Sequence, residues 1–197
     1  MRFAALDHRF TGVAVPVSSL RTAESCGVGE FADLPLLGEW CRDVGLEAIQ
    51  ILPVNDTGTN SSPYSALSAF ALHPLYLRLQ DIPGARRHAE EIAEFARAAD
   101  ERQSATGGRF DYGTVLRFKL SIVERLFGEH AAEVRNDKAF ALWRKANPWI
   151  GPYAAFTVLK KERGNAPWGS WASIIDPTPA DIAVYWDARQ DACLLAA

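Results

Sequence analysis

Residues Ala48 to Tyr76 read AIQILPVNDTGTNSSPYSALSAFALHPLY, and this stretch decides the fold. It begins with an apolar run, Ala48 to Leu52, whose length and β-branched content are typical of a buried strand. Pro53 ends that strand, because proline has no backbone N–H to donate to a sheet. A loop rich in Asn, Asp, Gly, Thr and Ser follows and closes on Ser62-Pro63-Tyr64. Parallel α/β proteins bind ligands at the carboxyl ends of their strands, so we predict a ligand contact in this loop.

The residues before this stretch complete a βαβ unit. Thr11 to Val17 is short, Val-rich and apolar, which predicts a first strand. The apolar residues between Phe31 and Val44 recur at helical spacing. We expect this helix to begin near Asp33, so that Pro35 falls in its first turn, and to stop at Gly45. Glu47 to Leu52 is then a second strand, parallel to the first. The helix face expected to pack on the strands carries Leu34, Leu37, Trp40 and Cys41.

The chain changes character after Leu77, where the patterns predict helices joined by Gly- and Pro-rich links. The first is charged and alanine-rich, as expected of a solvated surface helix, and the second is capped by Asp111. A loop rich in Gly, Pro and Trp, from Gly164 to Pro179, precedes the last helix. The predicted helices are Ala85 to Gln103, Tyr112 to Phe127, Asp137 to Lys145, Trp149 to Lys161 and Asp181 to Leu195.

Composition excludes several classes of protein. The 197 residues are 48% hydrophobic and 23% charged, as in an ordinary soluble domain, and the net charge of −3 argues against nucleic-acid or anionic-membrane partners. No apolar run approaches the roughly 20 residues of a membrane span, and the N-terminus does not resemble a secretory signal. Three widely spaced cysteines without a C-x-x-C pair predict neither disulfides nor a zinc site, so we expect a cytoplasmic protein.

The sequence carries two blocks, Gly12 to Gly29 and Gln50 to Tyr76, that resemble the amylomaltases, the 4-α-glucanotransferases or disproportionating enzymes of starch and maltodextrin metabolism. The resemblance covers most of this chain but only the N-terminal part of the family, and later matches such as Asp111-Tyr112, Lys119 and Pro167-Trp168 support it more loosely. The first block carries Gly12 to Pro16, Ser19-Leu20 and Gly27 to Gly29. The second carries Gln50, Leu52, Pro53, Thr57, Gly58, Ser62, Pro63, Tyr64, Ser68, Phe70, Ala71, Pro74 and Tyr76.

This resemblance implies an α/β fold in which residues 1–77 open a TIM-type (β/α)8 barrel and residues 78–197 form an inserted, mainly helical subdomain. The chain would then stop before the barrel closes. The implied activity is retaining transglycosylation of α-1,4-glucans, which needs two carboxyl groups about 5 Å apart and no cofactor. The family motifs for those carboxylates are absent here, and Asp56 and Glu24 are not predicted to replace them, Asp56 being a turn residue. We therefore expect this chain to be inactive alone.

Tyr64 and Ser62 are the predicted substrate-binding residues, because the matching tyrosine of the family lines the sugar site. Pro63 restricts the backbone before Tyr64 and so limits where its ring lies. The alternatives are a core-packed Tyr64 and a Ser62 that only caps its own loop. Some relatives carry a second tyrosine at the position of Thr59, and its absence here puts their outer glucan site in question.

Other readings of the chain remain open. His73 lies in an apolar segment and is interpreted as a core histidine, and Trp168 and Trp171 as packing residues of the insertion. The whole chain is alternatively a non-catalytic glucan-binding or regulatory fragment, or a helical interaction module that has lost sugar binding. The expected partner is an α-1,4-glucan or maltooligosaccharide, and the sequence leaves the oligomeric state open.

Overall fold

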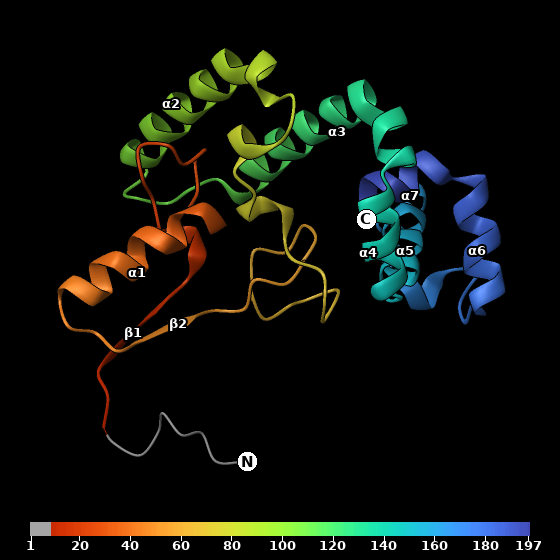
Figure 1. Cartoon of the computed structure of the whole chain (residues 1–197), viewed down its shortest axis with the longest axis horizontal. Helices are drawn as coiled ribbons and strands as arrows, with labels where there is room; N and C mark the ends of the chain where they lie inside the picture. Colours follow the sequence, from red (N-terminus) through yellow and green to blue (C-terminus); the bar gives the residue numbers. More distant parts are fainter. Residues whose placement is uncertain (1–8) are drawn as a thin grey trace. The chain divides into compact units, whose positions relative to one another are not determined.

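The computed structural model describes residues 9–197, which divide into two compact units. The first unit ends at Val123 and the second is Glu124–Ala197, so the division falls within one long helix, α3 (Figure 1). The domain boundary that the family resemblance implies, between residues 77 and 78, stays a prediction. Within residues 9–197, none of the helices combines the length and the apolar composition that a membrane span requires.

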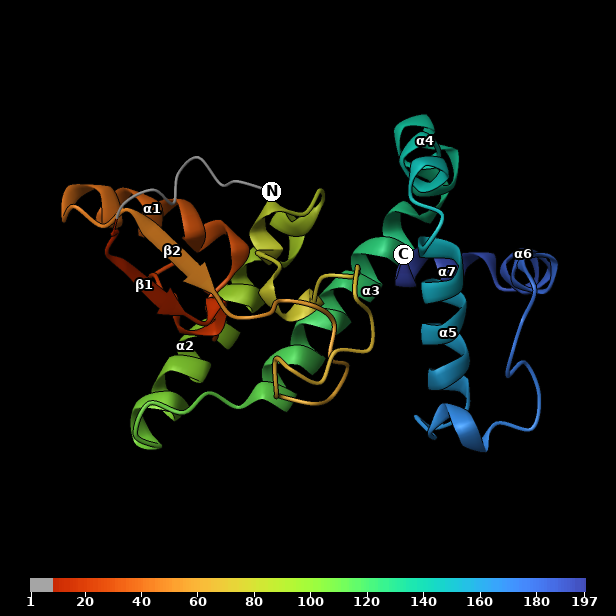
Figure 2. The same cartoon turned by 90° about the horizontal axis from the view of Figure 1, so that it is seen from below.

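A βαβ unit opens the first unit, as predicted. Strands β1 (Gly12–Val15) and β2 (Ala48–Ile51) pair in parallel, with Gly12 opposite Ala48 and Val15 opposite Ile51, and Figure 2 shows them side by side. Between them, α1 (Leu34–Asp43) follows a 3-10 turn, Phe31–Asp33, and has its proline in the first turn. Gly45 adopts φ 77°, the left-handed conformation that ends helices, so the predicted stop is confirmed.

Two packing predictions for this unit are wrong. Strand β2 is not buried, because its Ile49 and Ile51 side chains are 39% and 38% exposed. Trp40 of α1 is also exposed, whereas Cys41 is buried. The reason is that only two strands are present, so one helix shields part of the sheet and nothing in the described chain completes a two-sided layer around it.

Helices follow the 54–76 loop, as predicted, with shifted ends. A 3-10 turn, Ala85–His88, leads into α2 (Ala89–Ala105), whose Ile92 and Ala99 are buried while its charged side chains face solvent. The next helix, α3, runs over Tyr112–Asn136 and is longer than the predicted Tyr112 to Phe127, because the apolar pattern continues through Ala131 and Val134. Asp111 caps α3: its Oδ1 accepts the Thr114 N–H at 3.0 Å.

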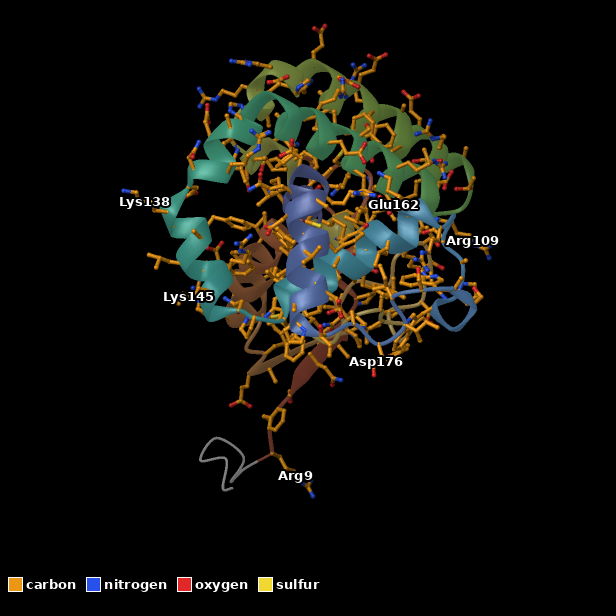
Figure 3. The ribbon with its side chains drawn as sticks, turned by 90° about the vertical axis from the view of Figure 1, so that its right-hand side faces the viewer. Arg9, Arg109, Lys138, Lys145, Glu162 and Asp176 are labelled. Carbon is orange, nitrogen blue, oxygen red and sulfur yellow. The ribbon has the colours of Figure 1, made fainter. Side chains whose placement is uncertain are left out.

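The second unit has its own core. Helices α4 (Lys138–Ala146) and α5 (Ile150–Glu162) agree with prediction to within one residue at each end, and Figure 3 labels Lys138, Lys145 and Glu162 near their ends. The predicted last helix is instead two, α6 (Pro179–Ala188) and α7 (Gln190–Ala196), with a break at Arg189. This break lets α6 and α7 place different faces on one cluster, formed by Ala154, Val158, Trp186, Cys193 and Leu194.

A buried group of charges ties the first unit together. The Glu30 side chain is fully buried, and its carboxylate accepts hydrogen bonds from Lys119 Nζ at 2.5 Å, Arg78 Nε at 3.0 Å and the Cys26 N–H at 3.2 Å. Arg78 also pairs with the buried Asp33. Burial lowers the pKa of Lys119, and the adjacent Glu30 carboxylate opposes that shift. Three segments far apart in sequence are thus held at one point, which we call the charge cluster: Glu30, Asp33, Arg78 and Lys119.

Substitution of Glu30 tests this cluster. Glu30→Gln keeps the side-chain shape but leaves the Lys119 ammonium buried without its counter-charge, which costs about 3–5 kcal/mol of unfolding free energy. The matched control is Glu24→Gln, because Glu24 is exposed and contacts the same Arg78 at 3.1 Å, a surface pair that contributes about 0–1 kcal/mol. Urea unfolding followed by circular dichroism measures both, and equal losses would contradict a central role for Glu30.

Candidate functional site

A cavity of about 440 Å³ lies at the carboxyl ends of the two parallel strands. Pro16 and Val17 follow β1, and Leu52 and Pro53 follow β2, so both strand ends contribute to its wall. Apart from Ser18, the remaining lining comes from the loop after β2 and from the start of α3 with its preceding segment, where Figure 3 labels Arg109. The full lining is Pro16, Val17, Ser18, Leu52, Pro53, Ser61, Pro63, Leu75, Tyr76, Arg109, Phe110 and Tyr112.

Backbone hydrogen bonds close the base of the 54–76 loop. Asn55 and Leu72 form an antiparallel bridge, the Asp56 N–H donates to the Ala71 carbonyl at 2.9 Å, and the His73 N–H donates to the Val54 carbonyl at 2.9 Å. The two ends of the loop are therefore held as a short ribbon. The segment between them, residues 57–70, forms the tip that borders the cavity through Ser61 and Pro63.

Asp56 is a turn residue, as interpreted from the sequence. Its Oδ1 accepts the Gly58 N–H at 2.8 Å, the side-chain-to-backbone bond that makes an Asx turn. Gly58 has φ 59°, a conformation that favours glycine over other residues. The side chain of Asp56 is therefore engaged in shaping the loop that presents residues 59–64.

The two predicted substrate-binding residues lie together on this tip. The Tyr64 side chain is 71% exposed, so packing in the core does not account for its position. Ser62 is half-buried, its N–H donates to Asn60 Oδ1 at 2.9 Å, and its carbonyl accepts the Ser65 N–H at 3.1 Å. The backbone on both sides of Pro63 is thereby fixed, while the Tyr64 ring faces solvent beside a residue that lines the cavity.

His73 is buried, as predicted, but it does more than fill space. Its Nδ1 accepts the Leu75 N–H at 3.1 Å, so the imidazole proton resides on Nε2, which donates to the Tyr112 hydroxyl at 2.6 Å. The Tyr112 hydroxyl in turn donates to the Gly58 carbonyl at 2.8 Å. Burial raises the pKa of Tyr112, so this hydroxyl keeps its proton. The chain of bonds joins α3 to the tip of the loop.

The match to a family model decides what kind of protein this is. A model described as 4-alpha-glucanotransferase matches residues 15–195. The chain belongs to this family. It is 39% identical over 177 residues to the 4-alpha-glucanotransferase DPE2 of Oryza sativa subsp. japonica, a match that covers 83% of this chain and 18% of that protein. The 4-alpha-glucanotransferase of Chlamydia caviae is 35% identical over 164 residues, covering 81% of this chain and 30% of the relative.

Solved structures agree with this assignment at the level of the fold. The amylomaltase of Streptococcus agalactiae in complex with acarbose superposes with a TM-score of 0.73 at 20% identity, covering 96% of this chain and 37% of that one. The amylomaltase of Corynebacterium glutamicum gives 0.63, also at 20% identity, over 93% of this chain and 27% of that one. This 4-alpha-glucanotransferase family member thus spans well under half the length of the relatives it matches.

Sequence reasoning did not identify the partnership of His73 with Tyr112, which are 39 residues apart. One feature of the sequence pointed to Tyr112: Asp111-Tyr112 belongs to the looser family matches. His73 had no such indication, because it is an isolated polar residue in an apolar run. Of the acids considered as replacements for the missing catalytic pair, Glu24 pairs with Arg78 and Asp56 shapes its turn. Among residues 9–197, no three His, Cys, Asp or Glu side chains are grouped to hold a metal ion.

The state of His73 predicts a dependence of stability on pH. Burial lowers the pKa of His73 from its ordinary value of 6.5, and Asp56, 3.9 Å from Nε2, opposes the shift only in part. The other groups facing the ring, Tyr76 and Tyr112, stay neutral. Below pH 6.5, His73 therefore binds a proton in the unfolded chain more readily than in the folded chain. The unfolding free energy falls as pH decreases through that range.

Urea unfolding at pH 7.5 and pH 5.5 measures this effect. We expect the loss of stability at the lower pH to be smaller in His73→Gln, because that variant has no imidazole to protonate. His130→Gln is the control, since His130 is only partly buried and pairs with the exposed Glu133 at 3.0 Å. An identical loss in the wild-type chain and in His73→Gln would show that His73 does not titrate in this way.

Proposed function

We propose that this chain is the N-terminal portion of a 4-α-glucanotransferase that acts on α-1,4-glucans by retaining transglycosylation. The observation that carries the proposal is the cavity at the carboxyl ends of β1 and β2, bordered by a loop whose Tyr64 ring is exposed. Aromatic rings stack on the apolar faces of pyranose rings, and Ser62, two residues before Tyr64, carries a hydroxyl on the same loop tip. The amylomaltase of Streptococcus agalactiae was solved with acarbose, which supports an oligosaccharide as the ligand.

The chemistry would be shared with segments outside this chain. A retaining enzyme needs one carboxylate as nucleophile and a second as general acid and base, about 5 Å apart. Asp56 and Glu24 are engaged in a turn and an ion pair, so neither is assigned to these roles here. In this proposal residues 1–77 open a (β/α)8 barrel, residues 78–197 form an inserted helical subdomain, and the exposed Ile49 and Ile51 are covered when the barrel is complete.

The cysteines support a cytoplasmic location. Cys26, Cys41 and Cys193 are free and buried, as expected in a reducing compartment. No cofactor is invoked, because protein carboxylates perform this type of glucan transfer without one.

Substitution of Tyr64 tests the proposed sugar contact. Titration of maltotriose into the chain, followed by calorimetry, should show binding, and Tyr64→Leu should weaken it about 2- to 12-fold, because leucine lacks the stacking energy of an aromatic face. Trp40→Leu is the matched control: Trp40 is likewise an exposed aromatic of the first unit, but it lies on α1, whereas Tyr64 directly follows Pro63, which lines the cavity.

Three results would change the proposal. If maltotriose fails to bind the wild-type chain, the helical interaction module becomes the better interpretation. If Tyr64→Leu and Trp40→Leu bind as tightly as the wild type, the glucan site lies elsewhere. If Tyr64→Leu lowers stability and leaves affinity unchanged, Tyr64 is a structural residue.

A further inference from the structure

We propose that Tyr112 and His73 are positioning residues that latch the tip of the 54–76 loop and so hold the Tyr64 segment in place for a glucan. This inference rests on the proposed function, but its physical basis is separate. The tip would otherwise be joined to the protein mainly through its own ribbon-like base. The latch adds a connection from the tip to the first residue of α3.

The direction of each hydrogen bond follows from the donors available. Because the Leu75 N–H occupies His73 Nδ1, the imidazole can offer only its Nε2 proton to Tyr112. The Tyr112 hydroxyl then has one proton left, and the Gly58 carbonyl receives it. The Thr57 hydroxyl lies 3.2 Å from the same tyrosine oxygen and donates its own proton to the Asn60 carbonyl at 2.6 Å. The latch thus holds the Gly58 carbonyl, six residues before Tyr64 in the chain, and sets the Thr57 hydroxyl beside the same tyrosine oxygen.

The surroundings of the latch separate its polar function from packing. The Tyr112 ring packs beside the cluster of Val28, Leu75, Val115 and Leu116, and this contact does not need the hydroxyl. Tyr112 also lines the cavity, so the same residue touches the proposed glucan site and the loop that borders it. Removal of the hydroxyl alone therefore abolishes the hydrogen bonds of the latch and leaves the packing of the ring in place.

Three variants give a sharp test. Tyr112→Phe keeps the ring and removes the hydroxyl. His73→Gln places an amide N–H where Nε2 lies and so preserves the donor to Tyr112, whereas His73→Asn places an oxygen where Nδ1 lies and preserves only the acceptor for Leu75. A latch predicts that Gln is tolerated at position 73 better than Asn. A role in capping the turn at Leu75 predicts the reverse order.

Amide hydrogen exchange of the full 197-residue chain is the main readout. In Tyr112→Phe and His73→Asn, the Gly58 and Asn60 amides should exchange about 2- to 12-fold faster relative to the core amide of Leu116, as expected for the loss of one hydrogen bond. His73→Gln should stay near the wild-type ratio. Maltotriose affinity, measured on the same samples, should fall by a similar factor in the two variants that loosen the tip.

The outcomes distinguish this inference from the proposed function. Unchanged exchange at Gly58 and Asn60 in Tyr112→Phe, or Asn performing better than Gln at position 73, would overturn the latch. A loosened tip with unchanged maltotriose affinity would overturn its positioning role. Failure of the wild-type chain to bind maltotriose would instead count against the proposed function, and the exchange ratios would still decide whether the latch exists.

Discussion

The buried carboxylate of Glu30 is the constraint on which the first unit depends. It needs partners because a charge removed from water is strongly destabilised, and it finds them on Arg78 and Lys119, 48 and 89 residues away. The loop after β1, the segment after the 54–76 loop and helix α3 are thereby fixed to each other. Within the loop after β1, the backbone at Gly29 lies so close to the Val17 carbonyl that a Cβ at position 29 has no room, which accounts for the glycine there.

This cluster also orients the site. Lys119 lies seven residues after Tyr112 on α3, about two helical turns, so the two side chains project from nearly the same face. Holding Lys119 against Glu30 therefore directs Tyr112 towards His73 and the Gly58 carbonyl. A purely apolar contact would stabilise α3 without fixing its rotation as narrowly, whereas the ammonium of Lys119 must reach both Glu30 and the Leu77 carbonyl.

Local patterns were sufficient to predict the βαβ unit, because strand and helix periodicity, Pro35 near a helix start and Gly45 at its end act over a few residues. The turn role of Asp56 was predictable for the same reason. The break at Arg189 was not, because it depends on how Trp186 and Cys193 share a core with α5. The exposure of Ile49 and Trp40 was not predicted either. An apolar pattern identifies the apolar face of an element, but it does not show whether another layer of the protein covers that face. Pairings such as His73 with Tyr112 depend on tertiary contacts that spacing does not encode.

The site combines a rigid part and a presented part. The strand ends and the charge cluster are fixed by sheet pairing and buried ions, while Tyr64 is carried on a polar loop held by a few directed hydrogen bonds. A loop on a rigid scaffold is suited to ligand binding, because it exposes side chains without lowering the stability of the core. It also explains why a chain with a largely exposed sheet still forms a defined cavity at the strand ends.

In the proposed function, a maltooligosaccharide binds where the strand ends, the Tyr64 loop and the start of α3 meet. The most direct measurement is the change in backbone amide chemical shifts of the isotopically labelled chain as maltotriose is added. The account predicts that the shifts concentrate in residues 54–64 and 109–112, next to the cavity lining. Shifts confined to helices α4 to α7 would contradict it, because they would place the glucan on the second unit.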